Sequence, residues 1–234
     1  MLSFVPKQQS SFVDEYKQIS VLIHRFTTKV SHKLARMDKP VEKLLKYEIY
    51  AKGLDVSIQE LYASYEAAVF YREKVQGTSL EDMDEEEKMH YAKYVYFDKN
   101  GFVRVFSLLD KLGTFINELL NARTEKVKPH YSFFTVLRVL RQRNIHEQLT
   151  FPLNELKESC RPSTQRLRNR RNTEIHYMNS EMRDDLIQRT RQYGDELRLE
   201  NLDEQLHDLS VGLHMTMQAI KLTFQYADEL SLFD

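Results

Sequence analysis

The sequence has 234 residues, of which 41% are hydrophobic and 29% are charged, and its formal net charge is −1. This length suffices for one large domain, or for a domain of roughly 150 residues with a helical extension. A net charge near zero excludes a global positive field for binding nucleic acid, so any such site has to be a local basic patch.

The cysteine content and the apolar segments bear on the compartment. Cys160 is the only cysteine, which excludes an internal disulfide and a cysteine-based zinc site and fits a reducing environment. Residues 1–7 lack the basic and apolar regions of a signal peptide. No stretch approaches the roughly 18 uninterrupted apolar residues of a membrane span. We therefore expect a cytoplasmic protein that does not bind a membrane.

The N-terminal part of the chain shows helical periodicity interrupted by turn and cap signals. Spacings of three and four predict a first amphipathic helix. Its inward residues are Phe12, Tyr16, Ile19, Ile23, Phe26, Val30 and Leu34. Pro40 suits the first turn of a second helix, and Gly53 suits its end. The capping-box spacing of residues 57–60 predicts the start of a third helix, and it recurs after Gly77 at residues 78–81.

Residues 94–103 have two interpretations. Asn100-Gly101 between β-prone residues is typical of a hairpin turn. A long helical stripe nevertheless begins at Phe102 and takes up the second half of the candidate hairpin. That stripe contains Phe102, Phe106, Leu109, Leu112, Phe115, Ile116, Leu119 and Leu120. We therefore predict a helix.

The C-terminal half continues the helical pattern. Another helix begins at Phe133, Pro152 and Pro162 bracket a loop or a broken helix, and Ser163 can cap the helix that follows. The last helix begins at about Asp203 and turns Leu206, Leu209, Leu213, Met217, Ile220 and Phe224 inward. The sequence thus predicts an all-α bundle of about six or seven helices.

One short motif stands out from this helical background. Residues 171–176 read Arg-Asn-Thr-Glu-Ile-His and join a fixed positive charge, an amide and an imidazole in an arginine-rich segment. Chance predicts about 0.6 pairs of Arg and His at this spacing from 17 Arg and 8 His. Requiring Asn directly after the Arg lowers this to about 0.02. Arg141 and His146 share the spacing but lack the Asn.

The position of Arg171 on its expected helix supports a special role. The apolar stripe of this helix would contain Leu167, Ile175, Met178, Met182 and Leu186. Arg171 falls about 40° from Leu167, inside the stripe, where a permanent cation needs a carboxylate, a ligand or a water-filled cleft. Asn172 and His176 are four residues apart and share a face. The three side chains can border one cleft; alternatively, Arg171 pairs with Glu174, and His176 is an ordinary boundary histidine.

This motif, late in a helical chain and before a long final helix, resembles that of the HEPN (higher eukaryotes and prokaryotes nucleotide-binding) superfamily. Tyr96-Phe97-Asp98 leading into residues 106–112 is similar to the long second core helix of bacterial members. The resemblance covers roughly residues 85 to 230. It predicts an N-terminal helical extension at residues 1–80 and a HEPN-like core at residues 81–234, or one continuous domain.

The resemblance implies a metal-independent endoribonuclease acting on single-stranded RNA, or a noncatalytic relative that binds RNA or a protein partner. Family members dimerise, so we expect a homodimer with a composite cleft. A toxin or phage-defence role, with an antitoxin partner, belongs to the same implication. Toxin members paired with a nucleotidyltransferase often carry Tyr two residues after the His. Met178 occupies that position, which argues against control by tyrosine modification.

The residue types fit this chemistry. His176, with an imidazole pKa near 6.5, can remove the 2′-hydroxyl proton. Arg171 can bind the developing phosphate charge with a bidentate fork, and Asn172 would orient the phosphate or the imidazole. Candidate RNA contacts, or alternatively members of a solvated surface run, are Arg166, Arg168, Arg170 and Tyr177. No metal-ligand pattern or phosphate loop occurs, so we expect no metal and no other cofactor.

Overall fold

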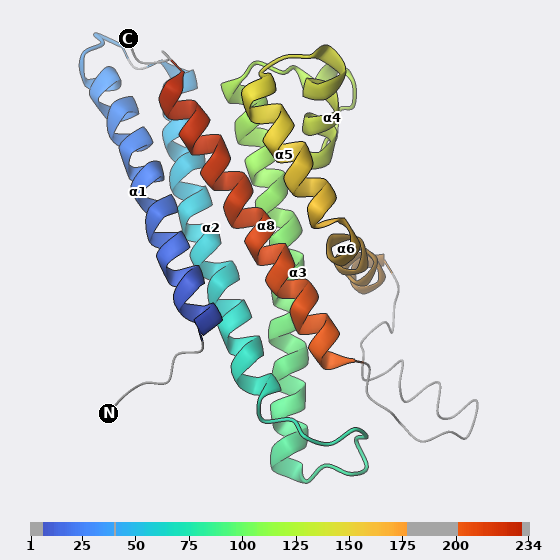
Figure 1. The fold of residues 1–234 in the computed structure, drawn as a ribbon. Helices are drawn as coiled ribbons and strands as arrows, with labels where there is room; N and C mark the ends of the chain where they lie inside the picture. Colours follow the sequence, from blue (N-terminus) through green and yellow to red (C-terminus); the bar gives the residue numbers. More distant parts are fainter. Residues whose placement is uncertain (1–6, 40, 177–200, 231–234) are drawn as a thin grey trace. The chain divides into compact units, whose positions relative to one another are not determined.

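The computed structural model describes residues 7–39, 41–176 and 201–230, which contain seven α-helices, one short 3₁₀ helix and no β-strand (Figure 1). The predicted all-α class is confirmed. In chain order the elements are α1 (Lys7–Ala35), α2 (Glu42–Arg72), α3 (Glu85–Leu119), η1 (Thr124–Lys126), α4 (Phe133–Arg143), α5 (Glu147–Ser159), α6 (Arg161–His176) and α8 (Leu202–Glu229). None of the described helices has both the length and the apolar content needed to cross a lipid bilayer.

The helices form two compact units. Unit 1 comprises Met1–Gln59, Ser107–Ser159 and His214–Asp234, and unit 2 comprises Glu60–Phe106 and Cys160–Leu213. Helices α2, α3 and α8 therefore each contribute to both units, whereas α6 belongs to unit 2 alone.

The core of unit 1 is built around an aromatic cluster. Phe26 of α1, Phe115 of α3 and Phe224 of α8 are all buried, with ring centroids 5.1–5.6 Å apart. Tyr47 of α2 meets the Phe115 ring edge-on at 6.2 Å. Such edge-to-face and offset geometries add to the stabilisation from area burial alone. Phe26, Phe115 and Phe224 lie on stripes that the sequence predicted to face inward, whereas Tyr47 was not identified from the sequence.

Helix α2 passes through the position where the sequence predicted a helix end. Gly53 lies inside α2, is exposed, and would have nothing within 4 Å of an added Cβ. An interior glycine costs a helix only about 1 kcal/mol relative to alanine. The neighbouring buried residues Leu54 and Ile58 outweigh that cost. Ser57 does not open a new helix; it is buried and accepts a hydrogen bond from Lys111 Nζ at 2.7 Å.

The start of α3 also differs from the prediction. Residues 78–81 do not open a helix; Ser79 Oγ instead accepts a hydrogen bond from the Glu81 N–H at 3.2 Å within a turn. The cap of α3 is Asp84, whose side chain accepts from the Glu87 N–H at 2.8 Å. Residues 94–103 are helical as predicted, with Gly101 facing Leu209 of α8. Packing of this segment as a helix therefore outweighs the local preference of Asn-Gly for a hairpin turn.

The region around Pro152 and Pro162 is a broken helix, one of the two predicted alternatives. Pro152 lies inside α5, and a turn at Cys160 separates α5 from α6. Ser163 is the third residue of α6, so its predicted role as the cap is wrong. The physical reason is Pro162, whose missing N–H costs nothing in a first turn and lets the helix begin before Ser163.

A pair within unit 1 gives stability a defined pH dependence. His214 Nδ1 lies 3.8 Å from Glu15 Oε2, and hydrogen bonding to Glu15 raises the pKa of His214 above its ordinary value. Because the pKa of His214 is higher in the folded than in the unfolded protein, its protonation stabilises the fold at pH values below the unfolded-state pKa. This stabilisation is lost as the pH rises through the folded-state pKa. We expect Glu15→Gln to lower Tm by up to about 3 °C near pH 5.5, the scale of a half-exposed pair. Near pH 9 the same variant should match the parent, as thermal melts at both pH values can check; an equal loss at both would contradict the assignment.

Candidate functional site

Helix α6, which carries the motif, lies against α3 and α8 within unit 2. In Figure 1 it is seen nearly end-on beside the first part of α8. Leu167 is fully buried and fits against Gly212 of α8, where an added Cβ would come within 2.7 Å of Leu167 Cδ1 and 3.2 Å of Val105 Cγ2 on α3. A side chain at Gly212 would require Leu167 or Val105 to shift. Leu167 therefore faces inward as the sequence predicted, whereas Ile175, expected on the same stripe, is 53% exposed.

Two ion pairs of opposite polarity join α6 to α3. Arg170 of α6 pairs with Asp98 of α3, whose side chain has no exposure to solvent. Glu174, one turn later on α6, pairs with Lys99 at 3.0 Å. Both acids and both bases are largely shielded, so each charge depends on its partner. The alternative in which Arg171 pairs with Glu174 is wrong, because the Glu174 carboxylate binds Lys99.

A third ion pair joins α6 to α8. Arg166 Nε and Nη2 donate to the two carboxylate oxygens of Asp208 at 2.7 and 2.6 Å. The Asp208 side chain is 2% exposed, and this fork geometry is the strongest type of arginine–carboxylate contact. Of the five arginines in this helix, Arg166 and Arg170 therefore each pair with a buried carboxylate.

Arg171 has a different environment from these two. Its guanidinium carbon lies 5.1 Å from the centroid of the Phe106 ring on α3, within the range of a cation–π contact. The guanidinium of Arg168 lies 5.9 Å from the same ring. The Arg171 Nε is buried and makes no hydrogen bond, and among the described residues no carboxylate pairs with Arg171. A half-buried cation is thus held on an aromatic face without a countercharge in the described part of the chain.

The remaining predicted residues are only partly described. Asn172 is half-buried and follows Arg171 on α6. His176 is the last described residue of that helix, and its side chain lies outside the described part of the structure, as does Tyr177. The structure therefore brings Arg168 and Arg171 together at Phe106, and it places Asn172 and the backbone of His176 on one continuous helix.

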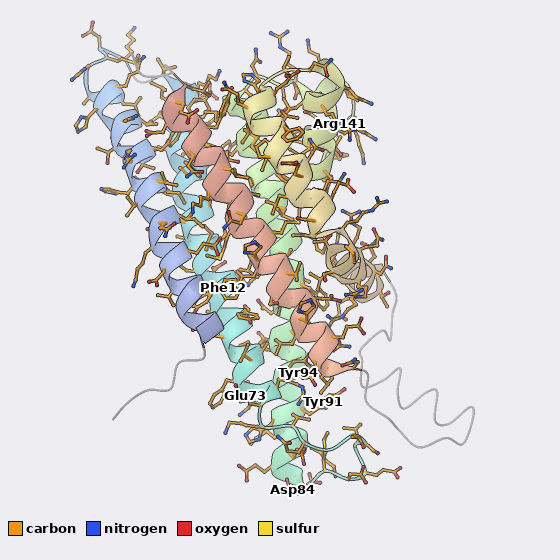
Figure 2. The ribbon with its side chains drawn as sticks, in the orientation of Figure 1. Phe12, Glu73, Asp84, Tyr91, Tyr94 and Arg141 are labelled. Carbon is orange, nitrogen blue, oxygen red and sulfur yellow. The ribbon has the colours of Figure 1, made fainter. Side chains whose placement is uncertain are left out.

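The second match to the Arg-and-His spacing has a different structure. Arg141 lies in the last turn of α4 (Figure 2), whereas His146 follows a break in which Asn144 and His146 both have positive φ. The imidazole Nδ1 of His146 lies 2.8 Å from the Tyr226 hydroxyl. This pair spans a turn rather than one helix, and its histidine is held by a bond within unit 1.

Tyr94 anchors the start of α8 close to the same face of α3. Its hydroxyl donates to the Leu202 carbonyl at 3.0 Å, and Figure 2 shows Tyr94 on α3 beside the beginning of α8. Burial, reinforced by the negative charge of Asp98, raises the pKa of Tyr94. The phenol therefore stays protonated and remains a hydrogen-bond donor at neutral pH.

Sequence reasoning missed the residues of α3 that hold the motif helix, namely Asp98, Lys99 and Phe106. A signal was present: Asp98, Phe102 and Phe106 recur every four residues and so share one helix face. A carboxylate on an apolar stripe of one helix and an arginine on that of another together favour a buried ion pair. The sequence pattern points to Arg171 as the cation on the inward face. In the structure the buried carboxylate of Asp98 pairs with the preceding residue, Arg170.

The fold and this site define an α-helical domain with an arginine-rich motif helix. The HEPN_Cthe2314-like HEPN family model matches residues 50–228, more than half of the chain, and the chain belongs to this family. No curated protein and no solved structure matches it. The match begins inside α2, and the boundary at residue 80 between an extension and a core stays a prediction. In the described parts of the chain, no three His, Cys, Asp or Glu residues gather so that they could hold a metal ion.

The close approach at Gly212 gives a test of how α6 is seated. Gly212→Val should lower the free energy of unfolding by about 1–3 kcal/mol, because the new side chain overpacks against Leu167 and Val105. Gly53→Val is the matched control at an open position of α2 and should change it by less than about 0.5 kcal/mol. Urea denaturation measures both, and equal effects would show that α8 and α6 are not in contact at Gly212.

Proposed function

We propose that the protein is a metal-independent endoribonuclease that cleaves single-stranded RNA. The supporting observation is the environment of Arg171, a half-buried cation seated on Phe106 whose nearest acidic neighbour in the motif, Glu174, is paired with Lys99. A permanent charge in such a position is costly unless an anionic ligand completes it. A phosphate group of RNA has the required charge and the geometry for a bidentate contact.

In the proposed reaction, His176 removes the proton of the ribose 2′-hydroxyl, and the 2′ oxygen attacks the adjacent phosphorus. The bond from phosphorus to the 5′ oxygen breaks, and that oxygen takes up a proton as it leaves. The products are a 2′,3′-cyclic phosphate and a 5′-hydroxyl. Arg171 stabilises the charge that builds up on the phosphoryl oxygens, and Asn172 orients the phosphate or the imidazole.

Four of the five arginines of α6 divide into two groups in this proposal. Arg168 shares the Phe106 ring with Arg171 and supplies a second positive charge near the scissile phosphate. Arg166 and Arg170 have their charges matched by Asp208 and Asp98, so they contribute less to RNA affinity than the sequence alone suggested. The predicted RNA contacts remain Arg166, Arg168, Arg170 and Tyr177.

A homodimer is the second part of the proposal. Tyr96 and Val103, seven residues apart on α3, are exposed, and Ile175 is exposed within the motif itself. Lys99 lies on the same face of α3 and pairs with Glu174, which places this apolar group next to α6. Exposed apolar side chains around an active-site helix suit a two-fold interface that joins two Arg171/His176 sets in one cleft.

We expect the purified protein to cleave single-stranded RNA in the presence of EDTA and to leave cyclic phosphate ends. His176→Ala should lower the rate by roughly 10²-fold or more, the scale of a lost general base. Arg171→Ala should have a similar effect, because charge stabilisation in the transition state is lost. Cleavage is followed on labelled RNA, and the ends are identified by mass spectrometry.

His146→Ala is the matched control for this experiment. It removes the histidine of the other Arg and His pair, breaks only the bond to Tyr226, and should leave the rate within a few fold. A contaminating nuclease would be insensitive to the His176 change. Intact RNA with the parent protein, or inactivation by His146→Ala alone, would rule out the proposed reaction. RNA that is bound but not cut would favour the noncatalytic alternative.

For the dimer, light scattering at micromolar concentration should give about twice the chain mass of 27.9 kDa. Tyr96→Glu should shift the mass toward the monomer, because it buries a charge at the proposed interface. Val21→Glu, at an exposed position of α1 in unit 1, is the control and should leave the dimer intact. A strict monomer for the parent protein would exclude the composite cleft.

The biological setting stays a prediction of the family resemblance. A toxin or phage-defence role and an antitoxin partner are consistent with RNA cleavage, since uncontrolled cleavage harms the cell. Growth arrest on induction of the parent protein, but not of His176→Ala, is the behaviour that this setting requires.

A further inference from the structure

We propose that Asp98 and Lys99 of α3 are positioning residues, which set the register and rotation of α6 so that Arg171 and Asn172 face the RNA phosphate; this inference rests on the proposed ribonuclease activity. The two residues are adjacent on α3, carry opposite charges, and pair with Arg170 and Glu174 on α6. Neither residue is a candidate for contact with RNA. Their effect on the reaction is therefore indirect.

The arrangement of charges selects one seating of α6. Arg170 and Glu174 are one helical turn apart, so a slide of α6 by one turn would bring Glu174 to Asp98, and two carboxylates would meet without solvent. The correct seating matches both pairs at once. Buried ion pairs are a weak source of net stability, and specifying one register is their best-supported role.

The seating fixes the residue that lies between the two pairs. Arg171 directly follows Arg170 and lies three residues before Glu174, so its position over Phe106 depends on both contacts. The Phe106 ring restricts movement of the Arg171 guanidinium on one side. The two ion pairs restrict movement of α6, the helix that carries Arg171. Preorganised charges of this kind stabilise a transition state without reorganisation during the reaction. A displacement of about 1 Å can cost on the order of 100-fold in rate.

The Lys99–Glu174 pair is suited to a charge-swap experiment because its side chains are 16% and 27% exposed, whereas Asp98 is fully buried and its variants risk unfolding. The set is Lys99→Glu, Glu174→Lys and the double variant. Each single variant places like charges together and should lower kcat by on the order of tenfold, with KM changed by less than about threefold. The double variant restores an attractive pair and should return kcat to within about threefold of the parent.

The signs of the two single effects separate positioning from simple electrostatics. If these charges acted only through attraction of RNA, Lys99→Glu would weaken the reaction and Glu174→Lys would strengthen it. Positioning predicts that both weaken it. Lys88→Glu is the control, because it makes the same charge change on α3 at a residue whose partner is Glu85 of the same helix, and it should leave kcat unchanged. Each rate is measured well below the Tm of its variant.

Amide hydrogen exchange across residues 161–176 gives a readout that does not need activity. Exchange should speed up in both single variants and return toward the parent rate in the double variant. Opposite signs for the single variants, unchanged kcat in both, or a double variant as slow as the singles would overturn the positioning role. If the parent protein cuts no RNA, the proposed function fails, and unchanged exchange in the single variants would then overturn this inference separately.

Discussion

The seating of the motif helix depends on the charge of Asp98. A carboxylate without solvent exposure is tolerated in unit 2 because Arg170 supplies the opposite charge, and removal of Arg170 would leave a carboxylate buried without this countercharge. Two other contacts hold the same helix: Leu167 packs against Gly212 of α8, and the Arg171 guanidinium lies over the Phe106 ring of α3. These contacts bring α6 close to α3 and α8, and the ion pair determines which residues of α6 face inward.

This constraint gives different roles to arginines that look equivalent in the sequence. The segment from Arg161 to Arg171 reads as a basic run, but its members have separate partners on α3 and α8. Arg166 and Arg170 connect helices, while Arg171 lies on an aromatic ring. A protein with a net charge of −1 can in this way concentrate usable positive charge at one place without a basic surface overall.

The sequence predicted the helices better than their ends. Periodicity identified the inward faces of α1, α3 and α8, because each face is long and its residues pack on several neighbours. The predicted break at Gly53 and the predicted starts at Ser57 and Thr78 were wrong, since local signals of about 1 kcal/mol compete with the burial of whole helix faces. The position of Asp98 on an apolar stripe indicates a buried ion pair, but its partner Arg170 could not be predicted, because the pairing depends on which helices meet in space.

The sequence alone also could not fully distinguish the candidate site from a chance match to its motif. In the sequence, the Arg171/His176 pair differs from the Arg141/His146 pair only by the Asn that follows Arg171. The structure adds a physical difference between the two pairs. Asn144, between Arg141 and His146, has positive φ, as does His146 itself, so the two side chains are not carried by one helix, and the His146 imidazole is bonded to the Tyr226 hydroxyl. Arg171, Asn172 and His176 lie on one helix that is attached to its neighbours by ion pairs with Asp98, Lys99 and Asp208 and by the contact at Gly212. A catalytic group needs a fixed backbone more than it needs a particular spacing, because stabilisation of a transition state depends on charges that are already in place. The contacts that fix α6 against α3 and α8 therefore support the proposed role of Arg171 more strongly than the rarity of its motif does.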